Sequence, residues 1–354
     1  QMKITKILVA LSFLFATSVH AGELTVTGNM QATYHTGSGL GTAPTVANTG
    51  GNSGNPLGMD RELKFAGTTE LDNGMTVSVM QDTTDALAFG DSLITFGNVM
   101  GMADIYVGSD GDPVDAIDDI TPTAFEEANG AGSGTHVDVN GNAGNTGIGT
   151  KFALPMLGAV NIKYYPKVDG SENADKANSG IASNGVGSAT SISTKTNLGD
   201  LPFAAALDGA TLTLGYAETE VGTAVNTDDA FDATAAINYS YGPIKFGYQK
   251  QVASLGNPDG TAATTDEIFY KNDIYGVAYA INDALSISYN RFDSYRHSVS
   301  AATTASSTQD TRAYSIGYTM GGMTIGFQDA STDDANFVTD QEDDTKTLSV
   351  AVAF

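Results

Sequence analysis

The hydrophobic and polar residues of this chain alternate with a period of two over long stretches. From Leu24 to Tyr34 the even-numbered residues are apolar or small, whereas the odd-numbered residues from Thr25 to His35 are polar and uncharged apart from the histidine. Alternation of this kind places the two classes of side chain on opposite faces of a β-strand. The stretch exceeds ten residues, although strands of globular proteins average about five or six. The pattern predicts long strands, each with one apolar and one polar face.

The alternation recurs to the end of the chain and is interrupted by connections of two kinds. Short turns rich in Gly, Asn, Asp and Pro are predicted at 72–74, 98–102, 155–158, 208–209, 242–243, 282–283 and 321–322. Longer polar connections are predicted at 37–58, 109–145, 169–187, 253–266 and 298–310. Seven hairpins account for fourteen strands, and the first and last strands bring the expected number to sixteen. The eighth strand is ambiguous, because Thr190–Thr196 and Leu201–Leu207 both fit it.

A long antiparallel sheet with one apolar face has to cover that face and pair its edges. No helical pattern after the N-terminal segment is long enough to provide the cover. Closure into a barrel pairs the edges, and lipid covers the outer face. We therefore predict an all-β fold, a transmembrane antiparallel β-barrel of about sixteen strands with short periplasmic turns and long outer loops. The alternative is a secreted β-sandwich or β-helix, but these strands are long for a sandwich and no fixed repeat is visible.

The first residues have the features of an export signal. Lys3 and Lys6 precede the apolar run Ile7–Ala16, and Val19 and Ala21 provide a small-residue cleavage pattern. The run is about half as long as the roughly 20 residues that a membrane-spanning helix needs. We predict a signal peptide over 1–21 and a single barrel domain over 22–354.

Composition excludes several classes of function. The chain has a formal net charge of −25 and no Cys, so a disulfide scaffold, a Cys-based metal site and a nucleic-acid partner are not expected. No nucleophile elbow, P-loop, dinucleotide fingerprint or EF-hand pattern occurs, and the four His lack metalloprotease spacing. We expect no enzymatic activity and no cofactor. Loosely bound calcium on clustered loop carboxylates is left open beside the alternative of a solvated acidic loop.

Two segments carry a resemblance to a known family. The last residues alternate through Leu348, Val350 and Val352 and stop on Phe354, which looks like the assembly signal of bacterial outer-membrane proteins. The segment Glu62–Met75 resembles the corresponding region of Gram-negative general porins, especially alphaproteobacterial ones. The resemblance implies a homotrimeric sixteen-stranded pore in the outer membrane of a Gram-negative bacterium, with its third long loop folded inward. Its implied partners are small hydrophilic solutes and ions, outer-membrane lipid and the barrel assembly machinery.

The third long connection, 109–145, is strongly acidic. Between Phe65 and Thr150 there are fourteen Asp and Glu residues and no Lys or Arg. If the loop folds inward, its carboxylates are the candidates for a channel constriction: Asp110, Asp112, Asp115, Asp118, Asp119, Glu126 and Glu127. Apolar residues in the same loop, including Val114 and Ile117, are candidates to hold it against the barrel wall. The alternative is an exposed acidic loop outside the barrel.

Strand parity predicts which basic residues face the lumen. Lys64, Lys151, Lys163 and Lys245 each lie on the polar face of a predicted strand. The chain departs from general porins in having few Arg and no arginine cluster. We expect a passive, modestly cation-preferring diffusion channel whose subunit contacts involve the Met-rich segment Met75–Met102. The alternatives are a surface adhesin or structural protein anchored by the barrel, and a solute-specific porin.

Overall fold

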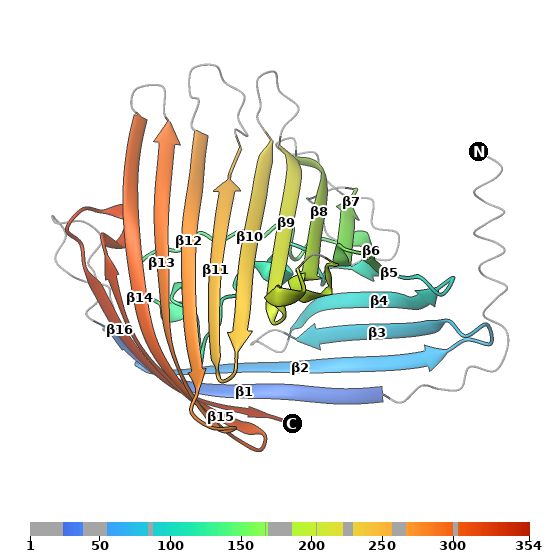
Figure 1. Ribbon diagram of the computed structural model, residues 1–354, viewed down its shortest axis with the longest axis horizontal. Helices are drawn as coiled ribbons and strands as arrows, with labels where there is room; N and C mark the ends of the chain where they lie inside the picture. Colours follow the sequence, from blue (N-terminus) through green and yellow to red (C-terminus); the bar gives the residue numbers. More distant parts are fainter. Residues whose placement is uncertain are drawn as a thin grey trace.

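The described residues of the computed structural model form sixteen antiparallel strands that close into one barrel (Figure 1). The structure describes residues 24–37, 55–83, 88–166, 168, 186–202, 204–221, 229–256, 267–299 and 304–354. The predicted signal peptide lies outside these residues. The strands are β1 (Leu24–Gly37), β2 (Leu57–Glu70), β3 (Thr76–Thr83), β4 (Phe89–Val99), β5 (Ala103–Gly108), β6 (Gly147–Leu154), β7 (Gly158–Tyr165), β8 (Val186–Asn197), β9 (Ala210–Val221), β10 (Ala230–Tyr241), β11 (Ile244–Ser254), β12 (Glu267–Ala280), β13 (Leu285–Val299), β14 (Thr304–Met320), β15 (Met323–Asp333) and β16 (Asp343–Ala353). The predicted closed antiparallel barrel of sixteen strands is confirmed.

Helical structure in the described residues is limited to single 3₁₀ turns. These turns are η2 (Asp115–Ile117), η3 (Asn129–Ala131), η4 (Leu198–Asp200), η5 (Ala205–Leu207) and η6 (Ala335–Phe337). Within the described part of the chain, no helix has the length and apolar character needed to cross a lipid bilayer.

The barrel closes between the first and last strands. β1 pairs with β16 in antiparallel register from Asn29 opposite Ala353 to Gly37 opposite Thr345. Beyond the ladder, the Phe354 N–H donates to Gly28 O at 3.0 Å, and the Gly28 N–H donates to Phe354 O at 2.9 Å. A Cβ at Gly28 would lie 2.4 Å from the Phe354 ring, so glycine provides the space for this ring at the seam. Closure leaves no unpaired sheet edge.

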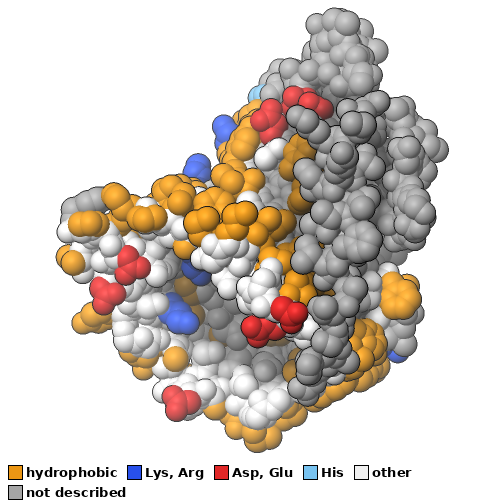
Figure 2. Space-filling model, turned by 90° about the vertical axis from the view of Figure 1, so that its right-hand side faces the viewer, with side chains coloured by type: hydrophobic (Ala, Val, Ile, Leu, Met, Phe, Trp, Pro, Cys, Tyr) orange, Lys and Arg blue, Asp and Glu red, His pale blue; other side chains and the backbone are white. Residues whose placement is uncertain are grey.

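The two faces of the wall have opposite character. Large apolar side chains are exposed on the outside all around the barrel, among them Ile94, Ile148, Leu214, Ile316 and Leu348. The alternate residues point inward and are mostly amides, hydroxyls and small residues, including the fully buried Gln249, Asn290 and Thr311. Figure 2 shows the molecule hollowed on one side, with hydrophobic side chains along its outer surface. The period of two seen in the sequence is therefore the alternation between an apolar outer wall and a polar inner wall.

Two details of the strand prediction were settled or corrected by the structure. Thr190–Thr196 belongs to β8, whereas 201–207 lies in the connection to β9 together with η4 and η5. The prediction of a long connection at 298–310 was wrong, because β13 reaches Val299 and β14 begins at Thr304. This part of β14 lacks the apolar half of the pattern. Its outward side chains form hydrogen bonds with polar neighbours instead. For example, the Tyr295 hydroxyl donates to the Ser306 hydroxyl at 2.8 Å.

We predict that deleting Phe354 lowers the yield of assembled barrel in cells more than it lowers stability in detergent. The deletion removes two backbone hydrogen bonds, each contributing about 1 kcal/mol, from a barrel closed by a complete ladder. Membrane yield and the denaturant midpoint of refolded protein measure the two effects separately. An unchanged cellular yield would show that Phe354 is not an assembly signal.

Candidate functional site

The acidic connection between β5 and β6 lies inside the barrel, along its inner wall. Its outgoing arm crosses β9, β11, β14 and β15, where Ile117, Pro122, Ala124 and Phe125 meet inward-facing glycines. The loop turns near β16, where Thr345 donates to Ala131 O at 2.8 Å. The return arm then passes β14, β12, β10 and β8. We call residues 109–146 the inner loop.

A row of glycines on the inner wall gives the outgoing arm its space. A Cβ at Gly247 would lie 2.3 Å from the Pro122 ring, and one at Gly276 would lie 2.7 Å from Pro122 O. Gly317 and Gly326 are paired in register, and their Cβ atoms would lie 2.0 and 2.2 Å from Ala124 O and the Phe125 ring. No neighbouring group can give way by that much, because the contacts include backbone and packed rings. These glycines let the loop approach the sheet closely.

Side-chain amides of the wall satisfy the loop's backbone carbonyls. Gln249 donates to the carbonyls of Ile117 (2.8 Å) and Asp118 (3.0 Å), and Gln328 donates to those of Glu126 (2.8 Å) and Glu127 (3.0 Å). Five further amides make the same kind of bond: Asn238 to Ile120, Asn290 to Pro122, Gln309 to Thr135, Asn272 to Val137 and Gln251 to Asp118. A loop that leaves water must pair its polar backbone groups. The inward amides of β10–β15 meet this requirement without bringing charge to the wall.

Apolar contacts hold the loop at two places. Val114 and Val139, from the two arms, are fully buried against Ala217 and Ala253 of the wall. At the far end, Ala128 and Ala131 pack with Phe292 and its buried neighbours on β12, β14 and β15. Val114 and Ile117 thus contact the wall as the sequence predicted.

The root of the loop is tied by two charged residues that were predicted to face the channel. Asp112 is only 1% exposed, and its carboxylate accepts hydrogen bonds from Val114 N–H (2.7 Å), Asn142 N–H (3.1 Å) and Tyr165 OH, among others. Lys163 is fully buried and donates to the carbonyls of Ser109 (3.2 Å) and Asp110 (2.9 Å). Both predictions of a channel-facing side chain differ from the structure. A buried charge persists only when it is paired or fully hydrogen-bonded, and these two residues are bonded mainly to the loop.

The remaining acids of the loop form a group without a basic partner among the described residues. Asp115 and Asp119 are exposed, whereas Asp110, Asp118, Glu126, Glu127 and Asp138 are half-buried. Burial and the adjacent Asp119 carboxylate raise the pKa of Asp118 to about 8. Burial, with a contribution from Asp119, raises the pKa of Glu127 to about 7, and burial raises that of Asp138 to about 6. This part of the loop therefore carries a charge that titrates near neutral pH.

Histidine and metal chemistry contribute little here. Burial lowers the pKa of His136 to about 4, so its ring is neutral, and it packs edge-on against Phe292 and bonds the Thr311 hydroxyl at 2.8 Å. In the described part of the chain, no three His, Cys, Asp or Glu side chains lie close enough to hold a metal ion. Loosely bound calcium on the loop carboxylates stays a prediction.

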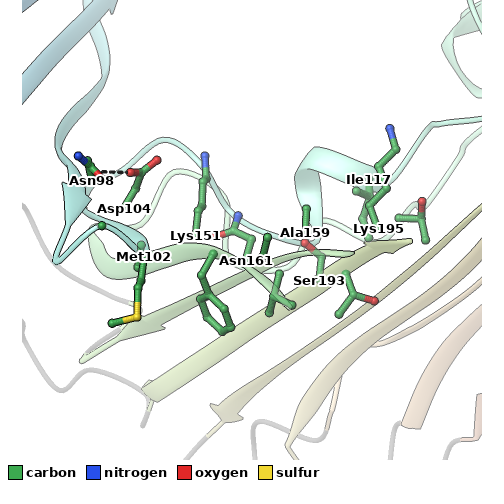
Figure 3. Close-up of a pocket in the computed structure, with 16 residues that line it drawn as sticks. Asn98, Met102, Asp104, Ile117, Lys151, Ala159, Asn161, Ser193 and Lys195 are labelled. Atoms are coloured by element: carbon green, nitrogen blue, oxygen red, sulfur yellow. Dashed lines mark hydrogen bonds between the residues drawn. The ribbon is translucent and has the colours of Figure 1, made fainter. Parts of the chain in front are cut away.

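The other three predicted wall lysines all lie on the inner face. Lys64 is opposite Asp82 in the β2–β3 register, Lys151 is opposite Asp104 in the β5–β6 register, and Lys245 is the second residue of β11. Lys151 and Lys195 both extend away from the wall in Figure 3. Lys195 was missed because the position of the eighth strand was ambiguous. Ser191, Ser193 and Lys195 share one parity, opposite to that of Ile192, so strand parity would have placed Lys195 on the inner face.

Comparisons with known proteins agree with the fold. No protein-family model matches the chain, and no curated protein matches it either. Among solved structures it is similar to the trimer form of OmpT, an outer membrane protein of Vibrio cholerae (TM-score 0.64, 9% identity, covering 94% of this chain and 100% of that one). It is also similar to the anion-selective porin from Comamonas acidovorans (0.62, 14%, 94% and 100%) and to Salmonella typhi OmpF in complex with daunomycin (0.57, 13%, 94% and 98%). At these identities the likeness shows the fold: a sixteen-stranded porin-like barrel over almost the whole chain.

We predict that Gly317→Val destabilises the protein by about 1–3 kcal/mol, the usual cost of overpacking. The new side chain would occupy the position of Ala124 O and push the outgoing arm off the wall. Gly67→Val is the matched control, since a Cβ there meets Val79 at an ordinary 3.6 Å. Guanidinium unfolding in detergent compares the two. Equal midpoints would mean that the loop does not depend on the glycine row.

A second prediction concerns pH. In the unfolded chain these carboxyl groups ionise near pH 4, but on the inner loop Asp138, Glu127 and Asp118 ionise only at about pH 6, 7 and 8. The folded protein binds more protons over this interval, so its unfolding free energy should fall as the pH rises from 5 to about 9. Unfolding midpoints across this range should decline less in the variant carrying both Asp118→Asn and Glu127→Gln. An identical decline in this variant would contradict the assignment.

Proposed function

We propose that this protein is an outer-membrane porin of a Gram-negative bacterium, a water-filled channel for passive diffusion of small hydrophilic solutes and ions. The observation that carries the proposal is the position of the inner loop. It folds back inside the closed barrel and packs against one part of the barrel's polar inner wall. A barrel of sixteen strands is wide enough to leave an aqueous lumen. From its root beside β5 and β7, the loop runs along β8–β16 and reaches His35 of β1 at Gly132. It thereby narrows the lumen against the side formed by β2–β4.

The outer wall supports a position in a membrane. Contiguous exposed apolar surface of this extent marks contact with lipid or with another protein. On β11–β14 the exposed apolar surface borders a band of four neighbouring tyrosines, Tyr248, Tyr275, Tyr289 and Tyr314. Aromatic residues in such a band mark the interface of a bilayer. Next to this band, toward the long-loop end, lie the outward ion pairs Lys250–Asp273 (2.8 Å), Arg291–Asp293 (2.5 Å) and Arg312–Asp333 (2.7 Å). Along the outer wall, aliphatic side chains thus give way to aromatic and then to charged side chains, which is the order expected at the edge of a hydrocarbon layer.

The charges at the constriction favour cations. A unit charge about 6 Å from the ion's path contributes roughly 0.7 kcal/mol in water, and screening reduces this to about 0.3 kcal/mol. Three uncompensated carboxylates then give about 1 kcal/mol, a partition ratio of roughly five. Asp115, Asp118 and Asp119 supply them when all three are ionised. Because the pKa of Asp118 is about 8, this requires a pH above 8, and the preference rises with pH. Lys163, which the sequence placed on the channel wall, is buried at the loop root and does not face these carboxylates across open water.

The test is single-channel recording of purified protein in planar bilayers under a KCl gradient. We expect ohmic pores whose reversal potential at pH 9, where Asp118 is ionised, corresponds to a K⁺ over Cl⁻ preference of roughly five. Neutralising Asp115, Asp118 and Asp119 together to Asn should remove most of this preference while leaving the pore open. Absence of conductance would refute the channel, whereas unchanged selectivity in the triple variant would refute only the role of the loop.

The barrel wall also supports the homotrimer that the family resemblance implies. The outward positions of β2, β3 and β5 hold no Tyr, and Arg61 is their one charged residue. Met59 (62% exposed), Leu57, Val79 and Val107 form an apolar surface there without the interfacial tyrosines of β11–β14. A face that lacks the aromatic band is better suited to a subunit contact than to lipid. Closed cyclic symmetry buries one such face in every subunit.

We predict a mass of three chains for the detergent-solubilised protein by light scattering corrected for detergent. Replacing Met59 and Val79 together by Lys should shift the population to one chain, because buried unpaired charge is strongly unfavourable at an interface. The same pair of substitutions at Ser306 and Thr308, outward at the long-loop end of β14, is the control. A single-chain mass for the wild type would refute the trimer.

A further inference from the structure

The inner wall on the short-turn side of the inner loop carries a second group of polar residues with its own chemistry. A cavity of about 530 Å³ lies there, lined by β4–β9 and by Ile117 of the loop. Lys151 and Lys195 stand on either side of it, with Asn161 and Ser193 between them (Figure 3). We propose that this cavity is a binding subsite for small dicarboxylates, with Lys151 and Lys195 each holding one carboxylate; the proposal rests on the channel function proposed above.

Register places the two lysines at a separation that suits two anionic groups. Lys151 of β6 is opposite Asn161 of β7, which is opposite Ser193 of β8, and Lys195 lies two residues further along β8. Two inter-strand spacings and two residues along the strand put their Cα atoms about 12 Å apart. Both side chains extend from the wall on the same side (Figure 3). With the two side chains extended side by side, as in Figure 3, two carboxylates joined by a short carbon chain can each contact one ammonium group.

The neutral groups between the lysines add hydrogen-bond donors. Asn161 Oδ1 already accepts the Tyr106 hydroxyl at 2.7 Å, which leaves its NH₂ group as the free part of the amide. Ser193 and Thr213 line the same cavity and supply hydroxyl groups. Ammonium, amide and hydroxyl donors together match the acceptors of a carboxylate.

The lysines are not neutralised by the acids around them. Asp104 is the acidic residue of the cavity, and its Oδ1 accepts the Asn98 N–H at 2.9 Å. Among the described residues, neither Lys151 nor Lys195 forms an ion pair; Lys151 Nζ lies 5.1 Å from the centroid of the Tyr106 ring. The inner-loop residues Asp115, Asp118 and Asp119 are not among the residues that line the cavity. The cavity therefore presents a local excess of positive charge inside a strongly acidic protein.

The test is block of the single-channel KCl current by succinate at constant ionic strength, with acetate as the monocarboxylate comparison. We expect succinate to reduce the current in a saturable manner and acetate to require about tenfold higher concentrations. In the variant with Lys151→Gln and Lys195→Gln the half-blocking concentration of succinate should rise about tenfold, since two exposed ion pairs each contribute a few-fold in affinity. Lys245→Gln removes the same charge from the inner wall outside the cavity and should leave succinate block within about twofold of the wild type.

A second measurement separates this proposal from the channel itself. Calorimetric titration of the detergent-purified barrel with succinate reports binding whether or not the protein conducts, and the double variant should lose the binding heat. Circular dichroism of each variant checks that the barrel is folded. Wild-type protein with no succinate binding, a double variant that binds as well as the wild type, or a Lys245→Gln variant that loses block equally would each overturn the subsite. Absence of conductance with binding retained would overturn the channel and leave the subsite standing.

Discussion

Pairing of the backbone at the β1–β16 seam is the constraint on which the rest of the structure depends. Each of the long strands has hydrogen-bonding groups along both edges, and a sheet of this size can pair all of them only by closing on itself. Once it is closed, every strand has one face outside and one inside. The period of two in the sequence, with Leu348 and Val350 outside and Ser349 inside, follows directly from that geometry.

Closure creates an interior, and this interior determines which hydrogen-bond partners the inner loop needs. A segment inside the barrel is cut off from much of the solvent that would otherwise hydrate its backbone, so its carbonyls need donors from the wall. Gln249, Asn290, Gln309 and Gln328 are those donors, and the glycines of β9–β15 bring the loop within their reach. At the root, Asp112 reverses the arrangement, with a loop carboxylate accepting from the loop backbone and from the wall. The loop is thereby held by many neutral bonds and by few charges.

The fold was predictable from the sequence because closure acts on every strand, and its signal is therefore repeated. Turn chemistry at 72–74, 242–243 and 321–322 and the alternation on either side were sufficient for sixteen strands. Prediction failed at Thr304–Asp310, where the apolar half of the pattern is missing. The inward position of the inner loop came only from family resemblance, because docking depends on pairs such as Gly317 and Ala124 that lie far apart in the chain. Asp112 and Lys163 could not be distinguished from channel residues by parity or charge, since only tertiary contacts bury them.

The way the loop is anchored has an electrostatic consequence. Lys163 bonds carbonyls only at the root of the loop. At Asp118 the carbonyl is bonded by the amides of Gln249 and Gln251, so the wall beneath Asp118 and Asp119 contributes no positive charge to neutralise them. The inward lysines Lys151, Lys195 and Lys245 instead lie within three residues of the short-turn ends of their strands. Apart from Lys64 in the middle of β2 and Asp104 opposite Lys151, the inward charges are therefore displaced along the barrel axis, with the acids of the loop at one level and these three lysines nearer the short-turn end. In the channel proposed above, an ion would meet the two signs one after the other, so a cation preference set by the loop is compatible with anion binding on the short-turn side. If lysines of the wall bound the loop instead, their positive charges would lie beside the loop carboxylates and neutralise them. The barrel would then have neither a separate acidic level nor a separate basic level.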